Sequence, residues 1–161
     1  MNDAEHHYVE ANDARTAVDM YKSAFRLDDA LRCAKAYCTP EVVQQTALES
    51  LMAVGVPGGL SHLEKNHSSL IEPLIDYAAD CSMFELAYEI AGGNYSNKVP
   101  DIHLKHAMYC QDNGDYKVAE KHFIEAKRAS EAIDMYKHVD NWSSALRVAV
   151  AHFGMSSNEV N

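Results

Sequence analysis

The chain of 161 residues contains few of the residues that interrupt regular structure, with 7 Gly and 4 Pro. Most of these lie between periodic segments, which argues against an all-β chain built on many tight turns. Positive charge is also scarce, since 14 basic side chains against 24 acidic ones leave a net charge of −10. A field of that sign repels phosphate backbones, so no nucleic-acid partner is expected.

Long hydrophobic runs are missing as well. No apolar run approaches the roughly 18 residues of a membrane-spanning helix, so no membrane insertion is expected. The first seven residues, MNDAEHH, are neither basic nor followed by an apolar stretch, unlike a secretion signal. The sequence therefore predicts a soluble, cytosolic chain.

Metal-binding spacings do not occur either. The four cysteines include no C-x-x-C pair, and we expect all of them to be small buried apolar residues; they are Cys33, Cys38, Cys81 and Cys110. Only one Glu-x-x-His motif, Glu64 to His67, is present, although a di-iron helical site requires two.

The histidines pair with neighbours only along single helices. His6 and His7 share a helix face with Glu10, and His103 shares one with His106. We expect such histidines to lie exposed or at helix edges. The sequence therefore predicts no catalytic, cofactor-binding or metal-ligating residues, and no cofactor.

An internal repeat is the strongest positive signal. When the chain is shifted by 115 positions, residues 4–38 align with residues 119–153 without a gap, and 16 of the 35 pairs are identical. The identities include Asp-Met-Tyr-Lys at 19–22 and Ala-Leu-Arg at 30–32. A weaker copy lies at residues 74–91, where Phe84 takes the position of Trp142. Such self-similarity is typical of repeat architectures.

Each copy shows three successive helical stripes. Apolar residues recur at i, i+3, i+4 and i+7, with small alanines alternating with large side chains. The first copy has these stripes at Ala4, His7, Tyr8, Ala11; Ala14, Ala17, Val18, Tyr21; and Leu27, Ala30, Leu31, Ala34. We expect the stripes to form ordinary core, with Trp142 as a buried anchor whose replacement by Ala costs about 3–5 kcal/mol.

Residues 100–126 form the clearest helical hairpin. Pro100 opens one helix, Asn113-Gly114-Asp115 turns the chain, and Ala119-x3-Phe123-x2-Ala126 lies on the second helix. The second-helix spacing matches the tetratricopeptide pattern, whereas Cys110 stands where an aromatic residue is usual. Farther upstream, Pro40 is expected to start a helix over 40–54, the segment 54–59 to break it, and another helix to begin near residue 60.

The sequence thus predicts an all-α fold, an α-solenoid of about ten short helices in antiparallel pairs, as in degenerate tetratricopeptide repeats. Residues 1–161 are expected to be one fragment of a longer array, truncated at both ends. The expected repeat units are about 4–38, 39–69, 70–99, 100–126 and 127–153. Gly154 should end a helix, and Ser156 to Glu159 should open another.

These repeats resemble the large intraflagellar transport subunits, which combine β-propellers with a helical solenoid. The resemblance rests on AEHHYVEANDARTAVDMYKSAFRLDDALRCAKAY, LIDYAADCSMFELAYEIA and the segment from Pro100 to Phe153. Residues 4–37 and about 70–153 match well, and residues 38–69 match loosely.

The resemblance implies a non-enzymatic scaffold that supports ciliary trains. It also implies other IFT-B subunits as partners, with IFT-A and motor components as further candidates, and a location in the cilium or flagellum and at its base, on the cytoplasmic side. A vesicle-coat or tethering subunit is the main alternative. A third reading is a peptide-binding tetratricopeptide module, in which Lys105 and two nearby histidines would grip a carboxylate.

Overall fold

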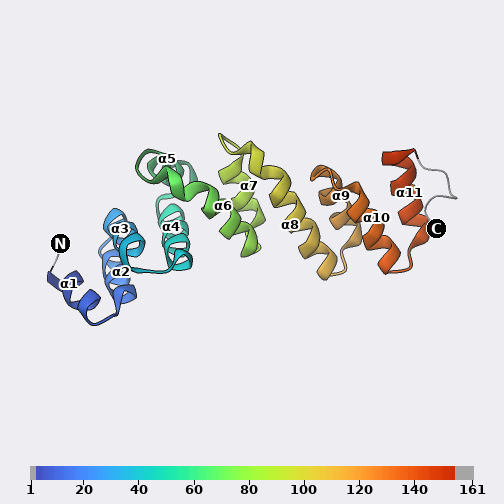
Figure 1. Cartoon of the computed structure of the whole chain (residues 1–161). Coiled ribbons are helices and arrows are strands. Elements are labelled where there is room, and N and C mark those ends of the chain that lie inside the picture. Colours follow the sequence, from blue (N-terminus) through green and yellow to red (C-terminus); the bar gives the residue numbers. More distant parts are fainter. Residues whose placement is uncertain (1–2, 155–161) are drawn as a thin grey trace. The chain divides into compact units, whose positions relative to one another are not determined.

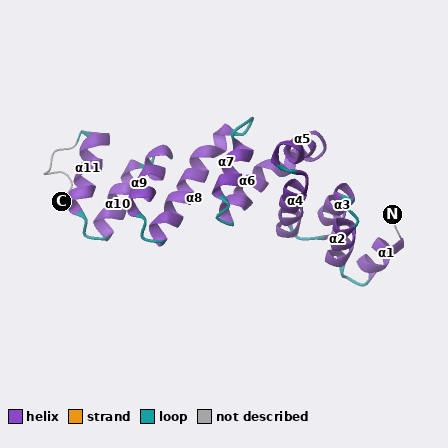
Figure 2. Cartoon of the chain, turned by 180° about the vertical axis from the view of Figure 1, so that it is seen from behind, coloured by secondary structure: helices purple, strands orange, loops and turns teal. Residues whose placement is uncertain are grey.

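The computed structural model describes residues 3–154. Helices form the regular structure of this part of the chain, which contains no strand (Figure 2). The α-helices labelled in Figure 1 are α1 (Asp3–Glu10), α2 (Ala14–Ser23), α3 (Leu27–Tyr37), α4 (Pro40–Val54), α5 (Val56–His67), α6 (Ile71–Asp80), α7 (Phe84–Ala91), α8 (Val99–Asp112), α9 (Tyr116–Glu125), α10 (Ala129–His138) and α11 (Trp142–Phe153). Two short 3-10 helices are η1 (Ser68–Leu70) and η2 (Ser96–Lys98).

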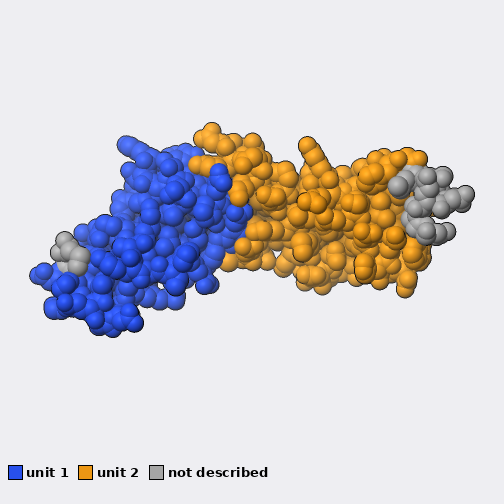
Figure 3. All heavy atoms as spheres, in the orientation of Figure 1, with its two compact units in different colours: residues 1–77 blue, residues 78–161 orange. Residues whose placement is uncertain are grey.

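The chain divides into two compact units, residues 1–77 and 78–161 (Figure 3). The boundary falls inside α6. In unit 1, α1 packs on α2, α2 on α3, α3 on α4 and α4 on α5. In unit 2, α7 packs on α8, and each helix up to α11 packs on the next. Such nearest-neighbour packing is the mark of an α-solenoid, and the predicted fold class is confirmed.

The five-repeat division stays a prediction. Ser156 to Glu159, where another helix was expected to begin, lie outside the described residues. Gly154 ends α11 in the left-handed conformation, with φ of 61°. Within residues 3–154, no helix combines the length and hydropathy that crossing a bilayer requires.

Six of the helix-to-helix connections share one turn geometry. In each turn one residue has a positive φ, and the next residue's N–H bonds a carbonyl five positions back, as from Asp13 to Tyr8 at 2.8 Å. This pattern is the Schellman motif that ends many helices. The positive-φ residues are Asn12, Phe25, Ser82, Gly114, Lys127 and Asp140. Only one of the six is glycine, so the array makes its tight turns with the low glycine content seen in the sequence.

The start of α5 corrects one expectation. The sequence predicted a break over residues 54–59, but α5 already begins at Val56, and only Gly55 stands outside a helix. The role of Gly59 is close approach, because a Cβ there would lie 2.9 Å from the Cα of Leu51 on α4. Helix α4 itself runs from Pro40 to Val54, as predicted.

Two of the three apolar stripes form core in both copies. On α2 and α3 the stripes bury Tyr21 and Leu31, and the equivalent helices α10 and α11 bury Tyr136 and Ala145. In unit 2 these residues join Ala107, Cys110 and Phe123 in one cluster of buried side chains. The expectation of ordinary core is therefore confirmed for these helices.

The first stripe behaves differently in the two copies. On α9, Phe123 is only 3% exposed because α8 packs against that helix. On α1 the equivalent Tyr8 is partly exposed and His7 is exposed, so this stripe is not the core that was predicted. No described helix covers α1 as α8 covers α9, and the buried side chain of α1 is instead that of Glu5.

The prediction of a buried Trp142 is wrong. Trp142 is 47% exposed, whereas Phe84, at the equivalent position of the middle copy, is 7% exposed. Phe84 is covered by His106 of the following helix α8, with ring centroids 4.0 Å apart. Within residues 3–154 no helix follows α11, so Trp142 has no such cover.

Candidate functional site

Three side chains from three consecutive helices meet in unit 1. Glu5 of α1 has a fully buried side chain and receives both Nη1 and Nη2 of Arg32 from α3, at 3.0 and 2.9 Å. The Tyr21 hydroxyl of α2 donates to Oε2 of Glu5 at 2.6 Å. A buried carboxylate is costly unless it is paired and hydrogen-bonded, and here it is both. We refer to this arrangement as the Glu–Tyr–Arg cluster.

Unit 2 contains the same cluster 115 positions later. Glu120 of α9 receives Nη1 and Nη2 of Arg147 from α11 at 2.9 and 2.6 Å, and the Tyr136 hydroxyl of α10 donates to Oε2 at 2.8 Å. The pairing of atoms is the same as in unit 1. The main difference is burial, because the Glu120 side chain remains 12% exposed.

Sequence reasoning did not predict that these residues meet. All three are identical between the two copies, but Tyr21 was predicted only as a core residue of an apolar stripe, and the identities of Glu5 and Arg32 indicated only duplication. The weak middle copy places Ala78 at the tyrosine position and Glu89 at the arginine position, so it cannot form the cluster. The signal available was therefore a set of polar identities kept by the two strong copies and lost in the third.

The clusters shift the acidity of their members. Hydrogen bonds from Arg32 lower the pKa of Glu5 to about 2. Burial, together with the hydrogen bond to Glu120, raises the pKa of Tyr136 to about 12. Each glutamate is thus an ionised acceptor with both oxygens occupied, and neither is placed to move a proton in a reaction.

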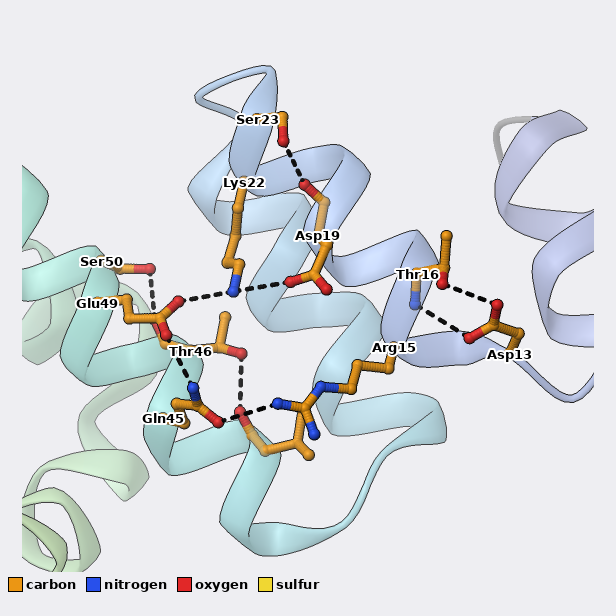
Figure 4. A network of polar contacts seen from close by, with 11 residues as sticks. Asp13, Arg15, Thr16, Asp19, Lys22, Ser23, Gln45, Thr46, Glu49 and Ser50 are labelled. Carbon is orange, nitrogen blue, oxygen red and sulfur yellow. Dashed lines mark hydrogen bonds and ion pairs between the residues drawn. The ribbon is translucent and has the colours of Figure 1, made fainter.

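A further polar contact in unit 1 links α2 to α4 (Figure 4). The Nζ of Lys22 lies 2.8 Å from a carboxylate oxygen of Asp19 and 2.6 Å from one of Glu49 on α4. Gln45 donates to the other Glu49 oxygen at 3.0 Å. This bridge joins α2 directly to α4, two helices that α3 separates in the sequence.

Three histidines and a tyrosine pack together in unit 2. His103 Nδ1 lies 2.9 Å from the Tyr88 hydroxyl and 2.9 Å from Nδ1 of His122. The rings of His106 and His122 are stacked with centroids 3.9 Å apart. The ring of Phe84 also stacks on that of His106. We call Tyr88, His103, His106 and His122 the histidine cluster. The prediction of exposed or edge histidines is wrong here, because all three are partly buried between α7, α8 and α9.

The ring arrangement favours neutral imidazoles. Burial lowers the pKa of each histidine, and for His122 burial and the nearby His106 and His103 lower the pKa to about 4. Two contacts converge on Nδ1 of His103, and because a neutral imidazole nitrogen has either one N–H or one lone pair, that atom makes a full hydrogen bond with either Tyr88 or His122. Stacked rings direct their lone pairs side by side rather than toward one ion, and within residues 3–154 no group of three or more possible ligands could hold a metal.

The other residues considered from sequence lie apart. His6 Nε2 is 3.0 Å from Glu10 in an exposed pair. Cys33 and Cys110 are buried as expected, but Cys38 is only partly buried and Cys81 is exposed, so that expectation is wrong for Cys81. Cys81 immediately precedes Ser82, the positive-φ residue of an exposed turn.

The carboxylate-gripping arrangement is not formed. Lys105 Nζ lies 2.6 Å from Asp80, and the two nearby histidines belong to the histidine cluster. A carboxylate ligand would meet a lysine that already has an acidic partner. The geometry therefore gives no support to the peptide-carboxylate reading.

A cavity of about 390 Å³ lies between α3, α4 and α5 in unit 1. Its wall includes the buried side chains of Leu31, Leu51 and Leu63. Volumes of 300–1,000 Å³ are typical of ligand pockets. This cavity has an apolar floor and no convergent set of catalytic groups.

The packed helix pairs, the recurrent turn and the duplicated cluster define a helical-repeat protein of the α-solenoid class. The chain is 37% identical over 149 residues, 92% of its length, to intraflagellar transport protein 172 of Chlamydomonas reinhardtii. It is 38% and 34% identical over 160 residues, 99% of its length, to the homologues of that protein in Mus musculus and Homo sapiens. These matches identify the chain as a segment related to intraflagellar transport protein 172.

The chain spans only 8–9% of the length of these relatives. No family model matches it. The resemblance to intraflagellar transport subunits is confirmed.

Proposed function

We propose that the chain is a non-enzymatic scaffold segment of an intraflagellar transport (IFT-B) subunit, supporting the assembly and movement of ciliary or flagellar trains. The observation that carries this proposal is similarity along 92–99% of the chain to proteins named intraflagellar transport protein 172. The proposed partners are other IFT-B subunits, with IFT-A and motor components as further candidates. The proposed location is the cilium and its base, on the cytoplasmic side.

The geometry supports a role in binding rather than in catalysis. The bidentate ion pairs, Glu5 with Arg32 and Glu120 with Arg147, connect helices to one another. Within residues 3–154 the carboxylates of these clusters have both oxygens engaged. Stacked helix pairs present distributed surfaces on which partners are recognised through many contacts.

Affinity capture from ciliated cells tests the proposal. The tagged 161-residue chain is expected to recover IFT-B subunits. A matched bait carrying Arg32→Met and Arg147→Met leaves the glutamates of both clusters without their arginines, and should lose this recovery if the folded array is what binds. Recovery of coatomer in place of IFT-B subunits would instead support the vesicle-coat alternative.

A further inference from the structure

Phe25 combines two unfavourable features. Its side chain is 84% exposed, and its φ is 54°, in the left-handed region. A bulky residue at positive φ is an outlier, and exposure of an aromatic ring forgoes its burial energy. The other five turns of this type carry Asn, Ser, Gly, Lys and Asp. Backbone outliers concentrate at functional sites. Phe25 is the one aromatic residue among these six turn positions, so the surface beside it is a candidate binding site.

Phe25 borders the cavity between α3, α4 and α5. The wall side chains Leu31, Leu51 and Leu63 are at most 2% exposed, whereas Val54 at the cavity is 57% exposed. The cavity therefore has a tightly packed apolar floor and an exposed apolar rim. At about 390 Å³, it has room for one large side chain from another molecule.

The cavity also has a fixed negative charge. Asp28 contributes to its lining and is 63% exposed, and one of its carboxylate oxygens lies 2.7 Å from Nε2 of His62 and 3.4 Å from Nε2 of His67. Arg26, two positions before Asp28 in the sequence, is paired with Asp29 at 2.6 Å. A cationic side chain beside the cavity would thus complement the Asp28 carboxylate.

We propose that this cavity is a docking site for a partner segment that inserts one large apolar side chain, Leu or Phe, and places an adjacent Lys or Arg against Asp28. Phe25 and Val54 close over the inserted side chain from the rim. The inference rests on the proposed function, binding of other proteins by the helical array, and deepens it by assigning one surface and the chemistry of its ligand.

Short synthetic peptides provide the probe, measured by calorimetry and by the methyl resonances of Leu31, Leu51 and Leu63 in the 161-residue chain. A peptide with a central Leu between Lys and Arg should shift these methyl signals. The same peptide with a central Ala should bind at least about tenfold more weakly, because it cannot fill the cavity. Equal binding of the Leu and Ala peptides would overturn the proposal.

Blocking the cavity gives a matched pair of variants. Gly58 lines the cavity within α5, and a Cβ there meets only Val54 Cγ1, at 3.4 Å, so Gly58→Leu should fold and fill the opening. Ser61→Leu adds the same side chain to an exposed position of the same helix. Binding of the Leu peptide should be lost in Gly58→Leu and kept in Ser61→Leu; loss in both, or in neither, contradicts the assignment.

The charge is tested separately. Asp28→Asn should weaken binding of the Leu peptide flanked by Lys and Arg severalfold. Binding of a Leu peptide flanked by Gln should be unchanged. Unchanged binding of the Lys/Arg peptide would remove the charged half of the proposal. Failure of every peptide to bind, together with successful capture of IFT-B subunits by the chain, would refute this docking site and leave the proposed function standing.

Discussion

The hydroxyl groups of Tyr21 and Tyr136, 115 positions apart in the chain, each donate a hydrogen bond to a glutamate on the preceding helix, at 2.6 and 2.8 Å. In both copies an arginine from the following helix completes the cluster, with Nη1 on Oε1 and Nη2 on Oε2. Each cluster therefore ties three consecutive helices together. The duplication has kept a polar arrangement down to individual atoms, alongside the apolar stripes.

Removing its arginine should destabilise the more buried cluster by more than the less buried one. Arg32→Met leaves the fully buried Glu5 carboxylate with one hydrogen bond, and should cost about 3–5 kcal/mol. Arg147→Met should cost less, about 1–3 kcal/mol, because Glu120 can reach solvent. Urea unfolding measures both costs. Arg128→Met breaks an exposed pair with Glu131 and serves as the control, and equal effects of all three variants would contradict the ranking.

The cluster in unit 1 should also set the acid stability of the chain. The folded pKa of Glu5, about 2, lies below its ordinary value of 4.5, so the folded state binds fewer protons there. This contribution is fully present above about pH 4.5 and is lost as the pH falls toward 2. Glu5→Gln should therefore flatten the fall in stability over that window, measured by denaturant unfolding at stepped pH. Glu10→Gln, at an exposed position of the same helix, is the control, and an equal flattening by both variants would contradict the role assigned to Glu5.

Local sequence determined most helix positions. Pro40 starts α4 as predicted, and Asn113-Gly114-Asp115 separates α8 from α9 as predicted, because caps and turns depend on neighbours within a few residues. The exposure of Trp142 could not be predicted from local sequence. Its stripe position is apolar in every copy, but exposure depends on whether another helix covers it, as α8 covers Phe84.

The polar sites were harder to predict for a related reason. A glutamate beside an apolar stripe reads as an exposed residue until an arginine 27 positions later is known to reach it. The cavity between α3, α4 and α5 similarly depends on how α5 crosses α4 at Gly59, which the sequence suggested was a chain break. Tertiary packing, rather than local propensity, decides both features.

The histidine cluster should add acid sensitivity in a second pH window. Since the folded pKa of His122, about 4, lies below its ordinary value of 6.5, the folded state binds fewer protons. Its neutral form favours the folded state fully above about pH 6.5, and this advantage is lost as the pH falls toward 4. His122→Phe keeps a ring against His106 and should reduce the stability loss between these pH values. Imidazole NMR titration showing an ordinary His122 pKa in the folded chain would contradict this expectation.

Trp142, the sole tryptophan, reports directly on the first turn of α11. Because it is 47% exposed, its fluorescence should be quenched substantially by iodide in the folded chain. Trp142→Ala should cost about 1–2 kcal/mol, below the range for a fully buried aromatic residue. Phe84→Ala, at the buried equivalent position, is the comparison and should cost more in urea unfolding. Strong protection of Trp142 from iodide would show that another surface covers it.

Exchange of the two turn residues in unit 1 tests the strain at Phe25. Asn12 and Phe25 occupy the same turn position with φ of 58° and 54°, and both are exposed. Asn tolerates the left-handed region better than a bulky side chain, so Phe25→Asn should raise stability by about 0.5–1 kcal/mol. Asn12→Phe should lower stability by a similar amount, about 0.5–1 kcal/mol, for the same reason. Thermal unfolding measures both changes, and a loss of stability in Phe25→Asn would show that the exposed ring makes stabilising contacts that outweigh its backbone strain. If Phe25→Asn stabilises the chain and also weakens binding of the Leu peptide, the aromatic residue at this turn serves binding at the expense of stability.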